Sequence, residues 1–171
     1  MSLRITAQEL LERYAAGERD FSGTGLREVE LIDVRLQGIN LRDADLIGAD
    51  LTGINLSDAD LSRANLRGTR LRQANLERAK LVEADLQCAV LEGANLIEAD
   101  LTRANVTEVN FMYARLMRAQ LFNARAPFIN LSGANLKDVR FFSFMFDVQG
   151  IIVDNTIMPD GSIEKDFRYL Y

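Results

Sequence analysis

The side chains that could do chemistry in this 171-residue chain are almost all carboxylates, with a single thiol beside them. The carboxylates recur in pairs two residues apart, at Asp43/Asp45, Asp58/Asp60, Glu83/Asp85 and Glu98/Asp100. Such pairs can exchange protons or hold a divalent ion when a cleft or a closing loop surrounds them. The chain has no histidine, which removes the commonest general base and transition-metal ligand. We therefore expect no catalytic, cofactor-binding or metal-binding residues, and we predict that the protein is not an enzyme.

Composition restricts the compartment and the kinds of partner. The single cysteine, Cys88, excludes an internal disulfide and favours a reducing compartment. Its thiol is interpreted as an incidental exposed group, with redox sensing as the alternative. No apolar run is long enough for a signal peptide or a membrane span, so we expect a cytoplasmic protein without a membrane partner. The net charge of -5 argues against direct nucleic-acid binding.

The elements that must position these side chains follow from a period of five residues. From Phe21 to Ile151 every fifth residue is Leu, Phe, Val or Ile, and Ala126 is the one exception. A small residue, most often Ala, stands two positions before most of these central residues, as in Ala44-Asp45-Leu46-Ile47-Gly48. Neither an α-helix nor a straight strand keeps every fifth side chain on one face. A chain that turns a corner once per repeat keeps every fifth side chain pointing inward. Glycines stand at the positions where such a corner needs a positive φ.

The outward residues that precede the central ones indicate how many sides one coil has. Three-sided or five-sided coils would stack several aspartates on one another, and like charges in register repel. With four sides, residues 20 apart stack, so that Asp60 lies between Asn40 and Lys80. One like-charged pair, Glu30 with Asp50, remains. The pattern therefore favours a four-sided solenoid filled with Leu and Ala.

The repeat A-(N/D)-L-x-x resembles that of the pentapeptide repeat proteins, in particular the stand-alone cyanobacterial members. The resemblance implies an all-β fold, a right-handed four-sided parallel β-helix. We expect residues 1–19 to form an N-terminal helical cap, residues 20–153 to form about seven coils, and residues 154–171 to form a C-terminal capping arm. Members of the family include proteins that protect DNA gyrase by imitating DNA and proteins linked to cell differentiation.

The two ends and one interior position depart from the repeat. Residues 6–17 predict a short amphipathic helix with Thr6 as N-cap, docked on the first coil. The run Met158-Pro159-Asp160-Gly161-Ser162 is rich in turn residues and predicts a hairpin or returning arm that closes the last coil. At Ala126 we expect Phe128 or Ile129 to fill the space of the missing large side chain, with a bend of the solenoid as the alternative.

Apolar residues at outward positions gather in the C-terminal third. They are Met112, Tyr113, Met117, Phe122, Phe128 and Phe142. Phe122 and Phe142 are expected to stack one coil apart. Two interpretations stay open and are compatible: the C-terminal arm covers these residues, or they contact a second copy or another protein.

The function that this pattern favours is a non-enzymatic interaction scaffold. We expect an unknown protein partner, or a homodimer, to contact the apolar outer surface of the C-terminal coils. The alternative is a DNA-mimicking regulator of a DNA-binding enzyme such as gyrase. Mimicry needs a uniformly negative stripe, and basic residues such as Arg70 and Arg72 interrupt the acidic faces.

Overall fold

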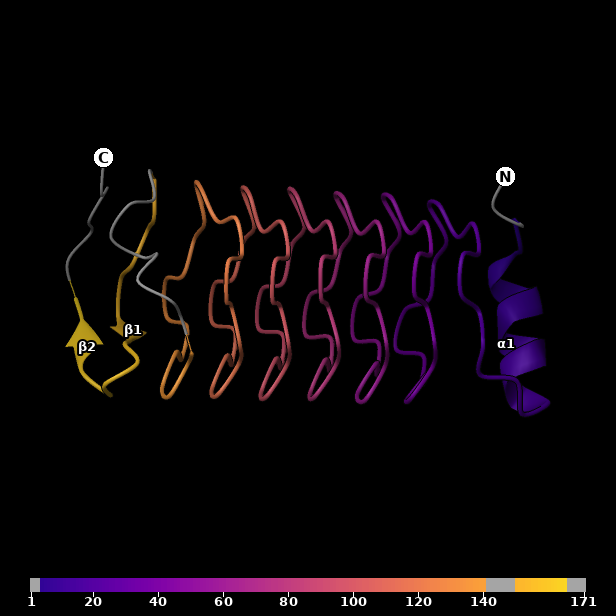
Figure 1. The fold of residues 1–171 in the computed structure, drawn as a ribbon, viewed down its shortest axis with the longest axis horizontal. Helices are drawn as coiled ribbons and strands as arrows, with labels where there is room; N and C mark the ends of the chain where they lie inside the picture. Colours follow the sequence, from indigo (N-terminus) through magenta and orange to yellow (C-terminus); the bar gives the residue numbers. More distant parts are fainter. Residues whose placement is uncertain (1–3, 141–149, 166–171) are drawn as a thin grey trace.

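The structure is a rod of stacked coils with a helix at one end and a small hairpin at the other (Figure 1). It is a computed structural model, and it describes residues 4–140 and 150–165. Residues 20 apart pair through parallel bridges, as Asn40 does with Asp60 and Asp60 with Lys80. Four five-residue repeats therefore make one coil, which confirms the predicted four-sided stacking. In the described part of the chain, no helix is long and apolar enough to cross a membrane.

Each repeat contributes one side of a coil, and we number the sides by their central residues. Side 1 carries Leu41, Leu61, Leu81, Leu101 and Leu121; side 2 carries Leu46, Leu66, Leu86, Val106 and Ala126; side 3 carries Leu51, Leu71, Leu91, Phe111 and Leu131; side 4 carries Leu56, Leu76, Leu96, Leu116 and Leu136. All of these side chains are buried. Sides 1 and 3 are opposite faces of the rod, and each corner is named by the two sides that it joins.

A local hydrogen-bond pattern explains why five residues make one side and one corner. In the Leu56 repeat, the Leu56 N–H donates to Asn75 O in the next coil (2.8 Å), and the Ala59 N–H closes the corner on Leu56 O (3.1 Å). The Ser57 N–H takes part in neither contact and donates to Oδ1 of Asn55 (3.0 Å). The same side-chain contact recurs in repeat after repeat, for example between Thr102 and Asp100. The Asn or Asp of the repeat thus satisfies the backbone donor that coil stacking leaves over, a role that the sequence analysis did not identify.

The corners have the backbone conformation that the glycine positions predict. The residue two positions after each centre has a positive φ, as at Gly48 (67°) and Asp58 (59°). The corner of the Leu56 repeat combines this φ with its hydrogen bond from Ala59 to Leu56, the pattern of a type II turn. Glycine adopts this conformation without steric cost, whereas other residues at the same positions are mildly strained.

The repeat around Ala126 keeps the register of the solenoid. Asn105 pairs with Arg125 and Asn110 with Asn130, both at the usual spacing of 20 residues. We expected Phe128 or Ile129 to fill the space beside Ala126. Phe128 does not, because its side chain is 56% exposed, whereas Ile129 is buried at the position where most repeats carry Ala.

The five-residue register changes between Arg140 and Ile152. Arg140 pairs with Gln120 at a spacing of 20 residues, whereas Ile152 pairs with Asn130 at a spacing of 22. The last coil therefore contains two more residues than the earlier ones. The prediction that Ile151 is a central residue is wrong, since Val153 takes that position. Pairing then continues to Ile157, beyond the boundary expected at residue 153.

The two ends carry the non-repeat elements. Helix α1 (Ala7–Ala15) begins after Thr6, whose Oγ1 accepts the Glu9 N–H (3.1 Å), as predicted. Its Leu10 is fully buried, and the Tyr14 hydroxyl donates to Gln37 O in the first coils (2.8 Å).

At the other end, strands β1 (Thr156–Ile157) and β2 (Ile163–Glu164) pair antiparallel around residues 158–162. This confirms the expected hairpin. Figure 1 places α1 and the hairpin at opposite ends of the rod.

Candidate interaction surface

Three of the six predicted contact residues lie along side 3. Met112 follows the centre of a side 3 repeat, Tyr113 occupies corner 3–4, and Phe128 occupies corner 2–3. The Tyr113 side chain is 61% exposed and that of Phe128 is 56% exposed. The two aromatic rings therefore flank one face of the rod, one at each edge.

The other predicted residues lie elsewhere. Met117 is half-buried on side 4, and Phe122 is half-buried on side 1, the face opposite side 3. Phe142, and with it the expected stacking of Phe122 on Phe142, lies outside the described residues. The predicted patch is thus spread around the rod, because residues that are near in sequence occupy different sides.

Both exposed rings rest on a glycine of the next coil. A Cβ at Gly133 would overlap the Tyr113 ring, and a Cβ at Gly150 would overlap the Phe128 ring. Because these glycines have no side chain, the rings pack along the rod against the next coil, and this contact restricts the positions that the rings can adopt. A ring that is already held in place loses little conformational entropy when a partner packs on it.

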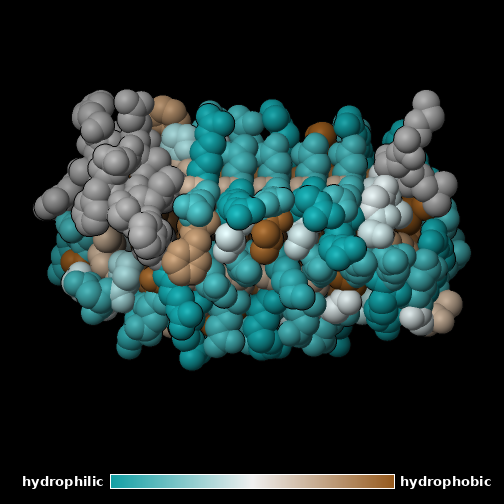
Figure 2. All heavy atoms as spheres, viewed as in Figure 1, coloured by the Kyte–Doolittle hydropathy of each residue, from teal (hydrophilic) through white to brown (hydrophobic). Residues whose placement is uncertain are grey.

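Side 3 also carries a third large exposed apolar residue. Ile32 is 48% exposed and follows Leu31, the central residue of an early side 3 repeat. Among the described residues, Ile163 of β2 is the one other large apolar side chain with such exposure. The exposed apolar side chains of the coils therefore gather on a single face. On the view drawn in Figure 2, the surface is mostly hydrophilic and its hydrophobic residues are scattered.

A hollow lies beside Tyr113. It has a volume of about 350 Å³ and is lined by Thr52, Arg72, Gln73, Glu92, Gly93 and Tyr113. It forms along corner 3–4, where Gly93 stands between Gln73 and Tyr113 and adds no side chain. Its walls combine an aromatic ring with hydrogen-bonding groups, a combination that suits contact with a protein side chain.

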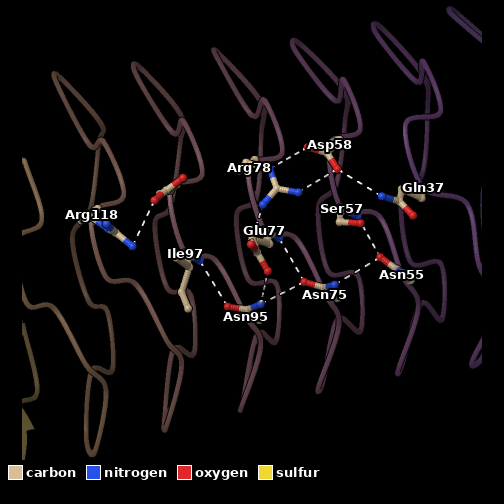
Figure 3. Close-up of polar contacts among 11 residues, drawn as sticks. Gln37, Asn55, Ser57, Asp58, Asn75, Glu77, Arg78, Asn95, Ile97 and Arg118 are labelled. Atoms are coloured by element: carbon tan, nitrogen blue, oxygen red, sulfur yellow. Dashed lines mark hydrogen bonds and ion pairs between the residues drawn. The ribbon is translucent and has the colours of Figure 1, made fainter.

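The two corners away from side 3 carry charges that neutralise one another. Four arginines contact carboxylates of the preceding coil: Arg63 with Asp43, Arg103 with Glu83, Arg78 with Asp58, and Arg118 with Glu98, at 2.7–3.1 Å. Figure 3 shows two of these pairs, on corner 4–1, beside a ladder in which Asn95 donates to Asn75 and Asn75 to Asn55. Surface ion pairs of this kind add little stability. Because positive and negative side chains alternate along these two corners, the described residues there form no dense stripe of negative charge.

These ion pairs predict how stability depends on pH. The guanidinium of Arg63 holds the pKa of Asp43 below its ordinary value, and Arg78 has the same effect on Asp58. A carboxyl whose pKa is lowered in the folded state contributes its full stabilisation at pH values above its unfolded pKa of about 3.9. This contribution is lost as the pH falls through the lower pKa of the folded state. We expect a constant Tm down to about pH 5 and a fall of a few degrees below about pH 4, measured by circular dichroism. A double variant, Asp43→Asn with Asp58→Asn, should show a shallower fall, and an unchanged fall would contradict the assignment.

Most of the paired carboxylates contact arginines, whereas Asp60 and Asp100 accept the backbone N–H two residues further on. Asp43 and Asp58 contact Arg63 and Arg78, and Asp45 contacts Arg27 (2.6 Å). Within residues 4–140 and 150–165, no group of three or more potential ligands is placed to hold a metal ion. The carboxylates thus serve the stacking of coils.

Cys88 lies on corner 2–3, one coil before Glu108. Its Sγ donates to Oε2 of Glu108 (3.4 Å), and this contact raises the pKa of the thiol above its ordinary value, with burial and the carboxylate charge acting in the same direction. The thiolate is the reactive form, so this environment lowers the rate at which the Cys88 thiol reacts at neutral pH.

We expect Cys88 to react slowly with iodoacetamide at pH 8, and Glu108→Gln to increase the rate several-fold because it removes the charge that opposes ionisation. At a pH where both thiols are fully ionised, the two rates should converge. Equal rates at pH 8 would show that Glu108 does not control the thiol.

Comparison with known proteins agrees with this architecture. The family model for pentapeptide repeats, in eight copies, matches residues 39–78 and 74–111. A pentapeptide repeat protein of the Arabidopsis thaliana thylakoid lumen is 34% identical over 53% of this chain, with a TM-score of 0.52, and this chain spans 63% of its length. No curated protein matches the chain.

Two further solved structures are similar over most of the chain. QnrB1, a plasmid-mediated fluoroquinolone resistance protein, is 16% identical over 98% of this chain and 88% of its own, with a TM-score of 0.58, which shows a shared fold. HetL, a pentapeptide repeat protein involved in heterocyst differentiation regulation in Nostoc, is 31% identical over 94% of this chain and 100% of its own, with a TM-score of 0.32.

The stacked five-residue repeats define the class of this protein as a solenoid repeat protein. More particularly, the chain belongs to the pentapeptide repeat family.

Proposed function

We propose that the protein is a non-enzymatic scaffold that binds a protein partner through the outer surface of its C-terminal coils. The contact is centred on Tyr113 and Phe128, on the right-handed β-helix that family membership implies. In this proposal α1 and the β1–β2 hairpin close the two ends of the rod, and the protein acts in the cytoplasm.

The observation that carries the proposal is the asymmetry between side 3 and the rest of the rod. Side 3 has exposed aromatic rings at both edges, each resting on a glycine, and corners that lack the ion-pair ladders of the opposite face. The Phe111 and Leu131 repeats of side 3, beside the two rings, carry no charged residue. Aromatic side chains in such a locally uncharged surface are typical of the energetic centre of a protein–protein interface. The interior is filled with Leu and Ala, so specificity must come from outward residues.

The second candidate is a regulator that imitates DNA and acts on a DNA-binding enzyme such as gyrase. It comes from the fold shared with the resistance protein QnrB1. A phosphate backbone is uniformly negative, whereas Asp43 and Asp58 are each neutralised by an arginine. A supercoiling assay with gyrase separates the two candidates: an effect at low micromolar protein favours mimicry, and no effect at high micromolar protein excludes it.

A position-dependent cross-linking experiment tests the scaffold proposal. A photoreactive phenylalanine derivative replaces Tyr113 in one variant and Asn123 in another, because Asn123 occupies corner 1–2, diagonally across the rod from Tyr113. Irradiation in extracts of the source cell should give one discrete protein adduct from position 113 and none from position 123. Equal adducts from both positions, or no adduct from position 113, would contradict a contact at side 3.

A further inference from the structure

Side 3 separates charged and apolar groups along the rod. At its N-terminal end, the Leu31 repeat and the corner before it carry Glu28, Glu30 and Asp33, all exposed. None of the three forms an ion pair with a described residue. At the C-terminal end of the same side lie the exposed rings of Tyr113 and Phe128.

Most charges between these ends are compensated, and Glu108 on corner 2–3, which accepts a hydrogen bond from Cys88, is the exception among the described residues. Arg70 contacts Asp50 (3.4 Å), and Arg72 contacts Glu92 (3.2 Å), all on side 3. The carboxylates around Leu31 are therefore the densest uncompensated charge of this side. A basic segment of a partner gains most from lying against that end, because complementary charge directs association and fixes orientation.

Glycines keep the side flat enough for an extended chain to approach. The Glu28 side chain lies over Gly48, with its Cγ 3.5 Å from the position of an added Cβ, and the Asp33 carboxylate lies over Gly53. Tyr113 and Phe128 lie over glycines in the same way. Of the seven corner glycines in the repeats, five flank side 3: Gly48, Gly53, Gly68, Gly93 and Gly133. The side chains at its edges thus lie along the rod instead of projecting from it.

The spacing of the two ends limits the length of the partner segment. The repeats of Leu31 and Phe111 are four coils apart, and Glu28 and Phe128 are five coils apart, which at about 4.8 Å per coil gives about 19–24 Å. An extended chain covers this distance in about six to seven residues, at about 3.3 Å per residue.

We propose that side 3 binds an extended segment of a partner protein that carries Lys or Arg at one end and an aromatic or large aliphatic residue about six to seven positions away. The basic end lies against Glu28, Glu30 and Asp33, and the apolar end packs on Tyr113 and Phe128. This inference rests on the proposed scaffold function and names the chemistry of its partner.

Selection of random twelve-residue peptides displayed on phage, against the intact protein, tests the inference. Enriched peptides should share a basic cluster and an aromatic or aliphatic residue five to seven positions apart. A synthetic peptide of this type should lose affinity at least ten-fold for the triple variant Glu28→Gln, Glu30→Gln, Asp33→Asn. The control variant Glu83→Gln, Glu98→Gln, Asp138→Asn changes the net charge equally on the other corners, and it should change the affinity less than two-fold.

The outcomes distinguish this inference from the proposal on which it rests. Peptides that need Tyr113 and Phe128 but bind the acidic triple variant unchanged would overturn the inference and leave the scaffold function standing. Equal losses in the triple variant and its control would show a general charge effect, which also overturns it, as would the absence of any enriched peptide of this pattern. Binding that is unaffected by substitutions at Tyr113 and Phe128 as well would count against both.

Discussion

Leu76→Ala is expected to lower the free energy of unfolding by about 3–5 kcal/mol. Leu76 is fully buried at the centre of side 4, and its neighbours in the adjacent coils, Leu56 and Leu96, are buried equally. The backbone of each coil is hydrogen-bonded to the coils on both sides, for example from the Leu76 N–H to Asn95 O (2.7 Å). The coils cannot move together to fill the space, so we expect a loss in the upper part of the range known for Leu→Ala substitutions.

Urea unfolding followed by circular dichroism measures this loss. Gln87→Ala is the matched control, because Gln87 points outward from side 2 and the substitution keeps its backbone N–H, which donates to Oδ1 of Asp85 (3.1 Å). The control should change the unfolding free energy by less than about 0.5 kcal/mol. A loss below about 1 kcal/mol for Leu76→Ala would contradict a closely packed interior.

The double variant Tyr113→Ala with Phe128→Ala should weaken binding of the cross-linked partner at least about 30-fold, corresponding to about 2 kcal/mol or more. Both rings are more than half exposed, so their removal should leave the unfolding free energy almost unchanged. The effect on binding is large because aromatic side chains held in a fixed position commonly dominate interface energies.

Isothermal titration calorimetry of the purified partner measures this effect. The matched control is Met117→Ala with Phe122→Ala, which removes two apolar outward residues from sides 4 and 1. The control should bind with nearly the affinity of the unchanged protein. A loss in the control as large as in the side 3 variant would mean that the contact is not confined to side 3.

The sequence predicted the architecture well because the repeat enforces it at every step. Large residues five apart and glycines at positions of positive φ indicate a chain that turns one corner per repeat, and the distribution of charges at spacing 20 indicates four sides. The bridge between Asp60 and Lys80 confirms the four-sided coil. The Thr6 cap and the C-terminal hairpin were equally predictable, because capping and turn residues act locally.

The register change after Arg140 was not predictable from the pattern. Ile151 and Val153 are both buried aliphatic residues, so either one fits the central position of a repeat. Only the pairing of Ile152 with Asn130 identifies the position that each takes. The exposure of Phe128 has a related cause, because Gly150 occupies the place beneath its ring only when the last coil contains two extra residues.

The sides of the rod that the proposed contact residues occupy were predictable in part. Tyr113, Met112 and Phe128 were identified from their outward positions, but sequence order placed Met117 and Phe122 with them although these lie on other sides. Sorting the residues by their position within a 20-residue coil separates the sides. That ordering also places the exposed Ile32 on side 3 with Tyr113 and Phe128, although it is far from them in sequence.

Amide hydrogen exchange measured by NMR, with and without the bound partner, tests the central claim most directly. The N–H groups of Met112 and Ser132 on side 3 donate to the side chains of Asn110 and Asn130 (3.0 Å each), and the Thr102 N–H on side 1 donates in the same way to Asp100 (3.0 Å). These amides differ in the face that they occupy and share their type of hydrogen bond. The partner should slow exchange at Met112 and Ser132 and leave Thr102 unchanged, whereas protection of Thr102 without protection of Met112 and Ser132 would contradict binding through side 3.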